Sequence, residues 1–183
     1  MEIILAKSAG FCFGVQRAVD TAYKEAGKQH VYTYGPIIHN EEVVTDLEKK
    51  GVRVLENEQE LKNLMEGTVV IRSHGVPKEI YEVIEEKGLE CVDATCPFVR
   101  KIHKIVERES KAGRHIIIVG NDTHPEVEGI KGWCEGPVTV ISSHEEAENL
   151  AFPEGEKLCV VSQTTFNYNK FQELVEIFEK KDR

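Results

Sequence analysis

Residues 115–124 read HIIIVGNDTH, an apolar run followed by a glycine and, four residues later, a histidine. A short run of β-branched residues that ends at Gly and Asn is typical of a buried strand in a parallel sheet. Residues 31–34, VYTY, are followed by Gly35 and His39 at the same spacing. We expect both histidines to lie in loops at the carboxyl ends of strands, where α/β sheets present their ligand-binding residues.

A cysteine precedes each copy of this pattern at nearly the same distance. Cys12 lies 27 residues before His39, and Cys96 lies 28 residues before His124. Each half of the chain therefore offers a thiol, an imidazole and a polar loop. This repetition indicates a duplicated module and predicts one site built between the copies.

The rest of the chain alternates apolar runs with segments of helical period. This alternation predicts an α/β fold with mostly parallel sheets, arranged as two similar modules at residues 1–95 and 96–183. The expected strands cover residues 3–6, 31–34, 52–55, 69–71, 91–92, 115–119, 138–141 and 158–161. The expected helices cover residues 15–26, 41–50, 78–87, 98–112, 145–150 and 169–180.

The composition is that of an ordinary globular protein, with 40% hydrophobic and 30% charged residues among 183. The formal charge of −9 argues against nucleic acid and against an anionic membrane surface as partners. No apolar stretch is long enough to span a bilayer, and the N-terminal MEIILAK is unlike a secretory signal. We expect a cytoplasmic protein whose thiols are reduced and suited to metal or redox chemistry.

Cys12 and Cys96 both stand where a helix is expected to begin. The positive end of a helix stabilises a thiolate, which is the form of cysteine that binds metals. Near the second cysteine, Thr95 is a candidate N-cap and Pro97 suits a first helical turn. Buried cysteines that pack as small hydrophobic residues are the ordinary alternative. Two equivalent contexts favour metal ligation.

The remaining cysteines lack this context. Cys91 and Cys159 lie within apolar runs and are expected in the core, and Cys134 has no partner at metal-ligand spacing. The sequence contains neither a CxxC nor an HxxxH pattern, which argues against a self-contained zinc site. A cysteine hydrolase that uses Cys12 or Cys96 is a distant alternative, because no triad is arranged locally.

Three histidines, His39, His74 and His124, follow expected strands and stand beside Asn, Gly or Pro. Loops of this kind converge to form sites, and imidazoles there can donate hydrogen bonds to phosphate oxygens. Thr164 adds a neutral donor after the last expected strand. Because the overall charge is negative, local donors of this kind must hold any anionic ligand.

Glu126 lies two residues after His124. A carboxyl beside a bound anion keeps its proton more readily, and this suits it to proton delivery. An ordinary first-turn glutamate of a helix is an equal alternative, since acids favour that position. Glu128 is expected on a helix surface.

Six motifs in this order closely resemble the 4-hydroxy-3-methylbut-2-enyl diphosphate reductases, the LytB-type enzymes of the non-mevalonate isoprenoid pathway. Any one of them is weak, but six in order are highly specific, and they span nearly the whole chain. The motifs are residues 10–15 (GFCFGV), 39–40 (HN), 73–76 (SHGV), 93–97 (DATCP), 124–129 (HPEVEG) and 163–165 (QTT).

The resemblance implies a trefoil of three α/β modules around a central [4Fe-4S] cluster, with one cysteine from each module. Cys12 and Cys96 would be two of the cluster ligands, and Glu126 would be the proton donor. The residues implied to line the cavity for the allylic diphosphate substrate are His39, His74, His124 and Thr164.

The implied reaction removes the allylic hydroxyl as water and gives isopentenyl and dimethylallyl diphosphates. Electrons would come from flavodoxin, ferredoxin or a similar donor. The chain ends at Arg183, where the family continues into a third module with the third cysteine. We therefore expect a truncated or partial chain that holds no stable cluster by itself, with an exposed face that favours self-association. The main alternative is a cluster-free module that binds anions such as diphosphate without catalysis.

Overall fold

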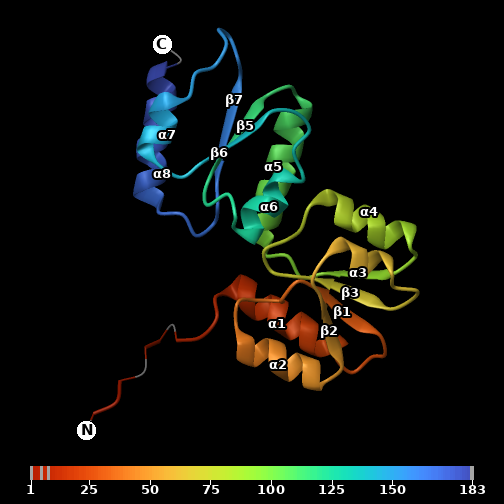
Figure 1. Cartoon of the computed structure of the whole chain (residues 1–183). Helices are drawn as coiled ribbons and strands as arrows, with labels where there is room; N and C mark the ends of the chain where they lie inside the picture. The colour runs from red at the N-terminus through yellow and green to blue at the C-terminus, as the bar shows by residue number, and fades with distance from the viewer. Residues whose placement is uncertain (1, 5, 8, 182–183) are drawn as a thin grey trace. The chain divides into compact units, whose positions relative to one another are not determined.

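Helices and strands alternate along the chain in a computed structural model that describes residues 2–4, 6–7 and 9–181 (Figure 1). The strands are β1 (Val31–Tyr34), β2 (Val52–Leu55), β3 (Thr68–Ile71), β4 (Glu90–Asp93), β5 (His115–Val119), β6 (Val138–Ile141) and β7 (Leu158–Ser162). The helices are α1 (Phe13–Glu25), α2 (Glu41–Lys49), α3 (Glu58–Lys62), α4 (Lys78–Glu86), α5 (Pro97–Lys111), α6 (Pro125–Lys131), α7 (His144–Asn149) and α8 (Tyr168–Lys181). The strand pairings are parallel, so the predicted α/β fold with parallel sheets is confirmed.

The described residues divide into two compact units. Unit 1 comprises Met1–Ser73 and Ile84–Cys96, and unit 2 comprises His74–Val83 and Pro97–Arg183. A ten-residue segment that follows β3 in the sequence therefore packs with unit 2. The module boundary between residues 95 and 96 stays a prediction.

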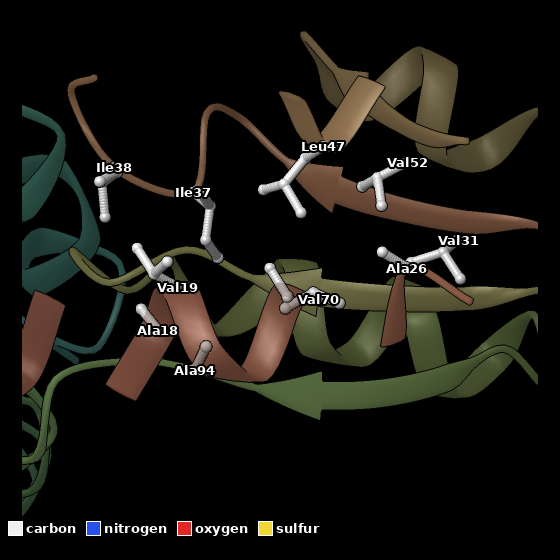
Figure 2. Packing of buried hydrophobic residues seen from close by; sticks show 11 residues of the cluster. Ala18, Val19, Ala26, Val31, Ile37, Ile38, Leu47, Val52, Val70 and Ala94 are labelled. Carbon is white, nitrogen blue, oxygen red and sulfur yellow. The ribbon is translucent and has the colours of Figure 1, made fainter. Parts of the chain in front are cut away.

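Unit 1 is built on a four-stranded sheet in the order β2-β1-β3-β4. The apolar sides of α1 and α2 cover one face of it. Figure 2 shows this core, in which Ala18 and Val19 of α1 and Leu47 of α2 pack with Val52 of β2 and Val70 of β3. Every residue of β3 is buried, so both faces of the sheet are covered at this strand.

Unit 2 is built on a three-stranded sheet in the order β6-β5-β7. Successive side chains of a strand point to opposite faces, and β5 follows this rule. Ile116 and Ile118 pack with residues of α5 and α6, whereas Ile117 and Val119 pack with residues of α7 and α8. The central strand is thus buried between two helical layers, as its continuous apolar sequence predicts.

The two sheets share one topology. In each, the first strand of the unit lies between the second and the third, and the chain crosses from one side of the first strand to the other. Connections that leave neighbouring strands in opposite directions open a crevice at the carboxyl edge of a parallel sheet. In unit 2 this edge carries the loops after β5 and β7, and His124 and Thr164 lie in these loops.

The expected strand at residues 3–6 is wrong for the described residues of that segment. Ile3 and Ile4 have no strand conformation and are 80% and 83% exposed; residue 5 lies outside the described residues. A strand needs a neighbour to pair its backbone N–H and C=O groups. An apolar pattern alone does not supply that neighbour.

Two short helices, α3 and α6, are not among the expected helices. Each is too short to show a clear helical period. The start of α3 nevertheless has a sequence signal, because the side chain of Asn57 accepts a hydrogen bond from the backbone N–H of Glu60. An Asn three residues before an acidic residue is a typical helix start.

Candidate functional site

The two predicted thiol ligands lie at helix starts in the structure. Cys12 is the N-cap residue of α1 and has an extended backbone and an exposed side chain that makes no capping hydrogen bond. Cys96 directly precedes Pro97, the first residue of α5, and the N-cap role of Thr95 stays a prediction.

A close contact brings Cys96 to the first turn of α1 within unit 1. A Cβ atom added at Gly14 would lie only 2.4 Å from the Sγ atom of Cys96 and 3.1 Å from its Cβ atom. Gly14 is two residues after Cys12 and is buried. The two thiols, which are far apart in the sequence, are therefore presented at the same end of one helix.

We expect Gly14→Ala to weaken metal binding at this thiol pair. Real Cβ atoms do not approach another atom to 2.4 Å, so Cys96 or the first turn of α1 must move. Overpacking of this kind costs about 1–3 kcal/mol of unfolding free energy, which exceeds the roughly 0.5–1 kcal/mol that alanine gains over glycine inside a helix. Urea unfolding measures the first effect, and bound iron after anaerobic reconstitution of the chain continued by its third module measures the second.

Gly27→Ala is the matched control for this substitution, because a Cβ atom at Gly27 meets nothing within 4 Å. Iron binding by the Gly14 variant at the level of this control would show that the close contact does not matter.

The other thiols are poor ligands by their surroundings. The pKa of Cys91 is raised to about 11, because its sulfur atom is partly desolvated and lies near the charge of Asp93. Burial also raises the pKa of Cys134 to about 12, and it raises the pKa of Cys159 as well. All three thiols stay protonated near neutral pH, whereas metals bind thiolates. Cys91 is nevertheless exposed on β4 at the edge of its sheet, so its expected place in the core is wrong.

His39 lies in unit 1, in the loop after β1, as the sequence predicts. The loop turns at Gly35, whose φ of 68° is the left-handed conformation that glycine adopts without strain. Ile37 and Ile38 are buried and fix the loop on the core, and the His39 side chain that follows is exposed. Asn40 then caps α2 by accepting a hydrogen bond from the N–H of Val43.

His74 and His124 lie together in unit 2. Their rings meet edge to face, with centroids 5.4 Å apart and planes at 80°. His124 is the N-cap residue of α6, and its Nδ1 atom accepts a hydrogen bond from the N–H of Glu126 at 3.1 Å. A neutral His124 ring must then carry its proton on Nε2, where it can donate to an anion.

The helix α6 also holds the loop that carries His74. Gly132 at the end of α6 lets Pro77 of this loop approach closely, because a Cβ atom at Gly132 would lie only 2.6 Å from the Cα atom of Pro77. The indole N–H of Trp133 donates to the carbonyl oxygen of Val76 at 2.9 Å. These contacts explain why His74, although it follows a strand of unit 1, belongs to unit 2.

Glu126 is buried, with 2% of its surface exposed, and both of its carboxylate oxygens are bound by Thr164. The backbone N–H of Thr164 donates to Oε1 at 2.6 Å, and its hydroxyl donates to Oε2 at 2.8 Å. Glu128, two residues further on, is exposed, as expected. Glu126 is therefore more than an ordinary first-turn acid of α6, because it joins the loop after β5 to the loop after β7.

Gln163 strengthens the same junction. Its side-chain oxygen accepts from the N–H of Asn121 at 3.2 Å, and its amide donates to the hydroxyl of Thr165 at 3.0 Å. The side chain of Gln163 packs closely on Gly120, so position 120 has no room for a residue larger than glycine. The loops that carry His124 and Thr164 are thus fixed to each other by two independent contacts.

Each unit carries a part of the predicted site residues. Unit 1 presents Cys12 and Cys96 at the same end of α1 and His39 on the loop after β1, and unit 2 carries His74, His124, Glu126 and Thr164. The thiol pair fits a thiolate-bound metal centre by its donor set and by the glycine cradle beside it. Two residues that fix these loops were not predicted from the sequence: Arg17, which donates to the carbonyl oxygens of Asp93 and Thr95, and Trp133, which donates to that of Val76. Their contacts join segments that are far apart in the sequence, so no local pattern marks them.

Comparison with known proteins identifies relatives over the whole chain. The family model described as "LytB protein" matches residues 3–183. The 4-hydroxy-3-methylbut-2-enyl diphosphate reductase of Caldanaerobacter subterraneus subsp. tengcongensis is 52% identical over 99% of this chain and 63% of the relative. The reductase of the same name from Alkaliphilus oremlandii is 44% identical over 99% of this chain and 64% of its own length.

Solved structures agree with these relatives. The E-1-hydroxy-2-methyl-but-2-enyl-4-diphosphate reductase of Plasmodium falciparum matches with a TM-score of 0.87 at 30% identity, over 96% of this chain and 55% of that one. A structure of (E)-4-hydroxy-3-methyl-but-2-enyl diphosphate reductase, the terminal enzyme of the non-mevalonate pathway, matches with a TM-score of 0.78 at 41% identity, over 97% and 63%. The chain spans a little under two thirds of the length of the curated relatives. Among the described residues, no helix is both long and apolar enough to cross a membrane.

Proposed function

Because the chain belongs to the LytB family, we propose that it supplies two of the three modules of a 4-hydroxy-3-methylbut-2-enyl diphosphate reductase. The reaction takes up two electrons and two protons, expels the allylic hydroxyl as water, and leaves isopentenyl and dimethylallyl diphosphates. The observation that carries this proposal is the placement of Cys12 and Cys96 at the same end of α1. The third cysteine belongs, on this proposal, to the part of the relatives that the chain does not span.

Cys12 and Cys96 are the residues proposed to hold a [4Fe-4S] cluster. A cluster with three thiolate ligands delivers electrons and keeps one iron open as a Lewis acid for the hydroxyl oxygen. Both cysteines stand at helix starts, at the same end of α1. The raised pKa values of Cys91, Cys134 and Cys159 support the choice of Cys12 and Cys96.

The substrate diphosphate is proposed to lie against His39, His74, His124 and Thr164. With its Nδ1 atom occupied by the N–H of Glu126, the His124 ring is oriented to donate from Nε2. Such N–H donors would hold the diphosphate, which the net charge of −9 otherwise opposes. Hydrogen-bond donors in the site are therefore proposed to bind the anion against the repulsion of the net negative charge.

Glu126 is the proposed proton donor. The hydroxyl of Thr164 lies between this carboxyl group and the loop surface, at 2.8 Å from Oε2, and Thr164 itself is exposed. With a protonated Glu126 this hydrogen bond reverses, and the carboxyl proton can pass to the hydroxyl oxygen while the hydroxyl gives its own proton to the substrate. Hydrogen bonds on both oxygens keep the carboxyl group in one orientation and make the transfer directional.

The remaining expectations extend this proposal. The electron donor is a flavodoxin, a ferredoxin or a similar small redox protein, and the enzyme acts in the cytoplasm. The first module covers residues 1–95 and the second covers residues 96–183. A third module completes the trefoil and covers the exposed face that would otherwise favour self-association.

The test uses the completed enzyme, in which this chain is continued by the part of the Caldanaerobacter relative that extends beyond the match. After anaerobic reconstitution with ferrous iron and sulfide, we expect bound iron, a broad visible absorption and reductant-dependent loss of the allylic hydroxyl. Absence of iron and of turnover in the completed enzyme would overturn the proposal. Diphosphate binding without iron would instead identify a cluster-free binding module.

A further inference from the structure

Arg17 ties α1 to the loop that ends in Cys96. Its guanidinium donates from Nη1 to the carbonyl oxygen of Thr95 at 3.0 Å and from Nη2 to that of Asp93 at 3.2 Å. These residues lie within unit 1, and the two bonds span 76 and 78 positions of sequence. The planar fork of the guanidinium suits two carbonyl oxygens on either side of Ala94.

The loop does not need Arg17 for its path along the sheet. The N–H of Ala94 donates to the carbonyl of Ile71 at 3.1 Å, and the N–H of Cys96 donates to that of Ser73 at 2.9 Å. The carboxylate of Asp93 also accepts from the N–H of Thr95 at 2.8 Å. The contribution particular to Arg17 is therefore the link between this loop and α1.

Arg17 and Gly14 act on the same loop from one side of α1. They are three residues apart, so they are neighbours on the helix surface. Gly14 allows the Cys96 side chain to lie against the first turn of α1. One turn further along the helix, Arg17 binds the carbonyl groups of Asp93 and Thr95. Together they set where Cys96 stands relative to Cys12 at the start of the helix.

We infer that Arg17 is a positioning residue that holds the Cys96 thiol beside that of Cys12, so that both can bind one metal centre. The role at a metal centre rests on the proposed function. The juxtaposition of the two thiols does not, and it can be measured without any metal. Lysine cannot replace Arg17 on this inference, because a lysine keeps the charge but has no planar fork for two carbonyls.

The first experiment measures whether the two thiols are neighbours. In a chain with Cys91, Cys134 and Cys159 changed to alanine, dibromobimane should bridge Cys12 and Cys96 and become fluorescent. We expect Arg17→Met and Arg17→Lys each to slow this bridging by about tenfold, as loss of orientation slows a reaction between two held groups. Arg53→Met is the control, because Arg53 is exposed on β2 and forms a surface ion pair with Glu60 at 3.8 Å.

A second measurement separates positioning from general loss of structure. In the same chain with Cys96 changed to serine, monobromobimane should label Cys12 at the same rate with and without Arg17→Lys. Circular dichroism should show an unchanged helix content. Bridging at the unsubstituted rate in a folded Arg17→Lys chain would overturn the inference, and so would an equal slowing by Arg53→Met.

The third measurement concerns the metal centre itself. In the completed enzyme, Arg17→Lys should lower bound iron and sulfide after reconstitution, while Arg53→Met should not. If the unsubstituted completed enzyme binds no iron, the proposed function fails, yet the bridging rates still decide whether Arg17 positions Cys96. Iron retention equal to that of the unsubstituted enzyme would overturn the role at the metal centre.

Discussion

Replacing Cys12 or Cys96 by serine is expected to remove the iron–sulfur cluster from the completed enzyme. A serine hydroxyl is almost isosteric with the thiol, but it does not ionise near neutral pH and is a poor ligand for iron in a sulfide cluster. The proposed cluster has three cysteine ligands, so each substitution removes one of the three. The iron and sulfide content per polypeptide should fall at least about tenfold. Removing a residue that only supports a metal ligand already lowers metal affinity by about this factor, and removing the ligand itself should do no less.

The matched control is Cys91→Ser. Cys91 is exposed on β4, so the same chemical change is made at a thiol whose pKa is raised to about 11 and which we do not expect to bind iron. This variant should keep its full iron content and its visible absorption. A Cys12 or Cys96 variant with the iron content of this control would remove that cysteine from the ligand set.

Glu126→Gln is expected to abolish most turnover while leaving the cluster and substrate binding intact. The amide has the shape of the carboxyl group, its oxygen can still accept from the N–H of Thr164, and its NH₂ group can donate to the hydroxyl of Thr164. The variant should therefore fold normally, but it has no acidic proton to deliver. Loss of a positioned general acid typically lowers kcat by about 10²–10⁴-fold.

Glu128→Gln provides the control for this second substitution. It makes the same change two residues away on α6, at a side chain that is exposed. Single-turnover kinetics with a chemical reductant would compare the two variants at equal iron content. A near-normal rate in the Glu126 variant would exclude this carboxyl group from the proton path.

The sequence predicts the central strands of this fold well because they are buried. Residues 115–119 form a strand with both faces covered, so the whole run must be apolar and its bounds are visible. The cysteines at the starts of α1 and α5 are equally visible, since glycine, proline and the apolar period mark where helices begin.

Contacts between distant segments could not be predicted in this way. The contact of Gly14 with Cys96 and the bonds of Arg17 depend on how α1 packs against the end of β4. The exposure of Cys91 depends on β4 being an edge strand, which an apolar run does not reveal. The roles of Cys12, Cys96, His39, His74, His124, Glu126 and Thr164 stay predictions until the variants are measured.

The segment His74–Val83 has a consequence for how this protein can be divided. It packs with unit 2, but it lies in the sequence between two parts of unit 1, so the backbone passes from one unit to the other at more than one point. Residues 97–183 produced alone would leave Gly129, Gly132 and Trp133 without the loop that they hold. Neither unit is encoded by one continuous stretch, and a recombination event or a protease cut at the apparent seam would damage both.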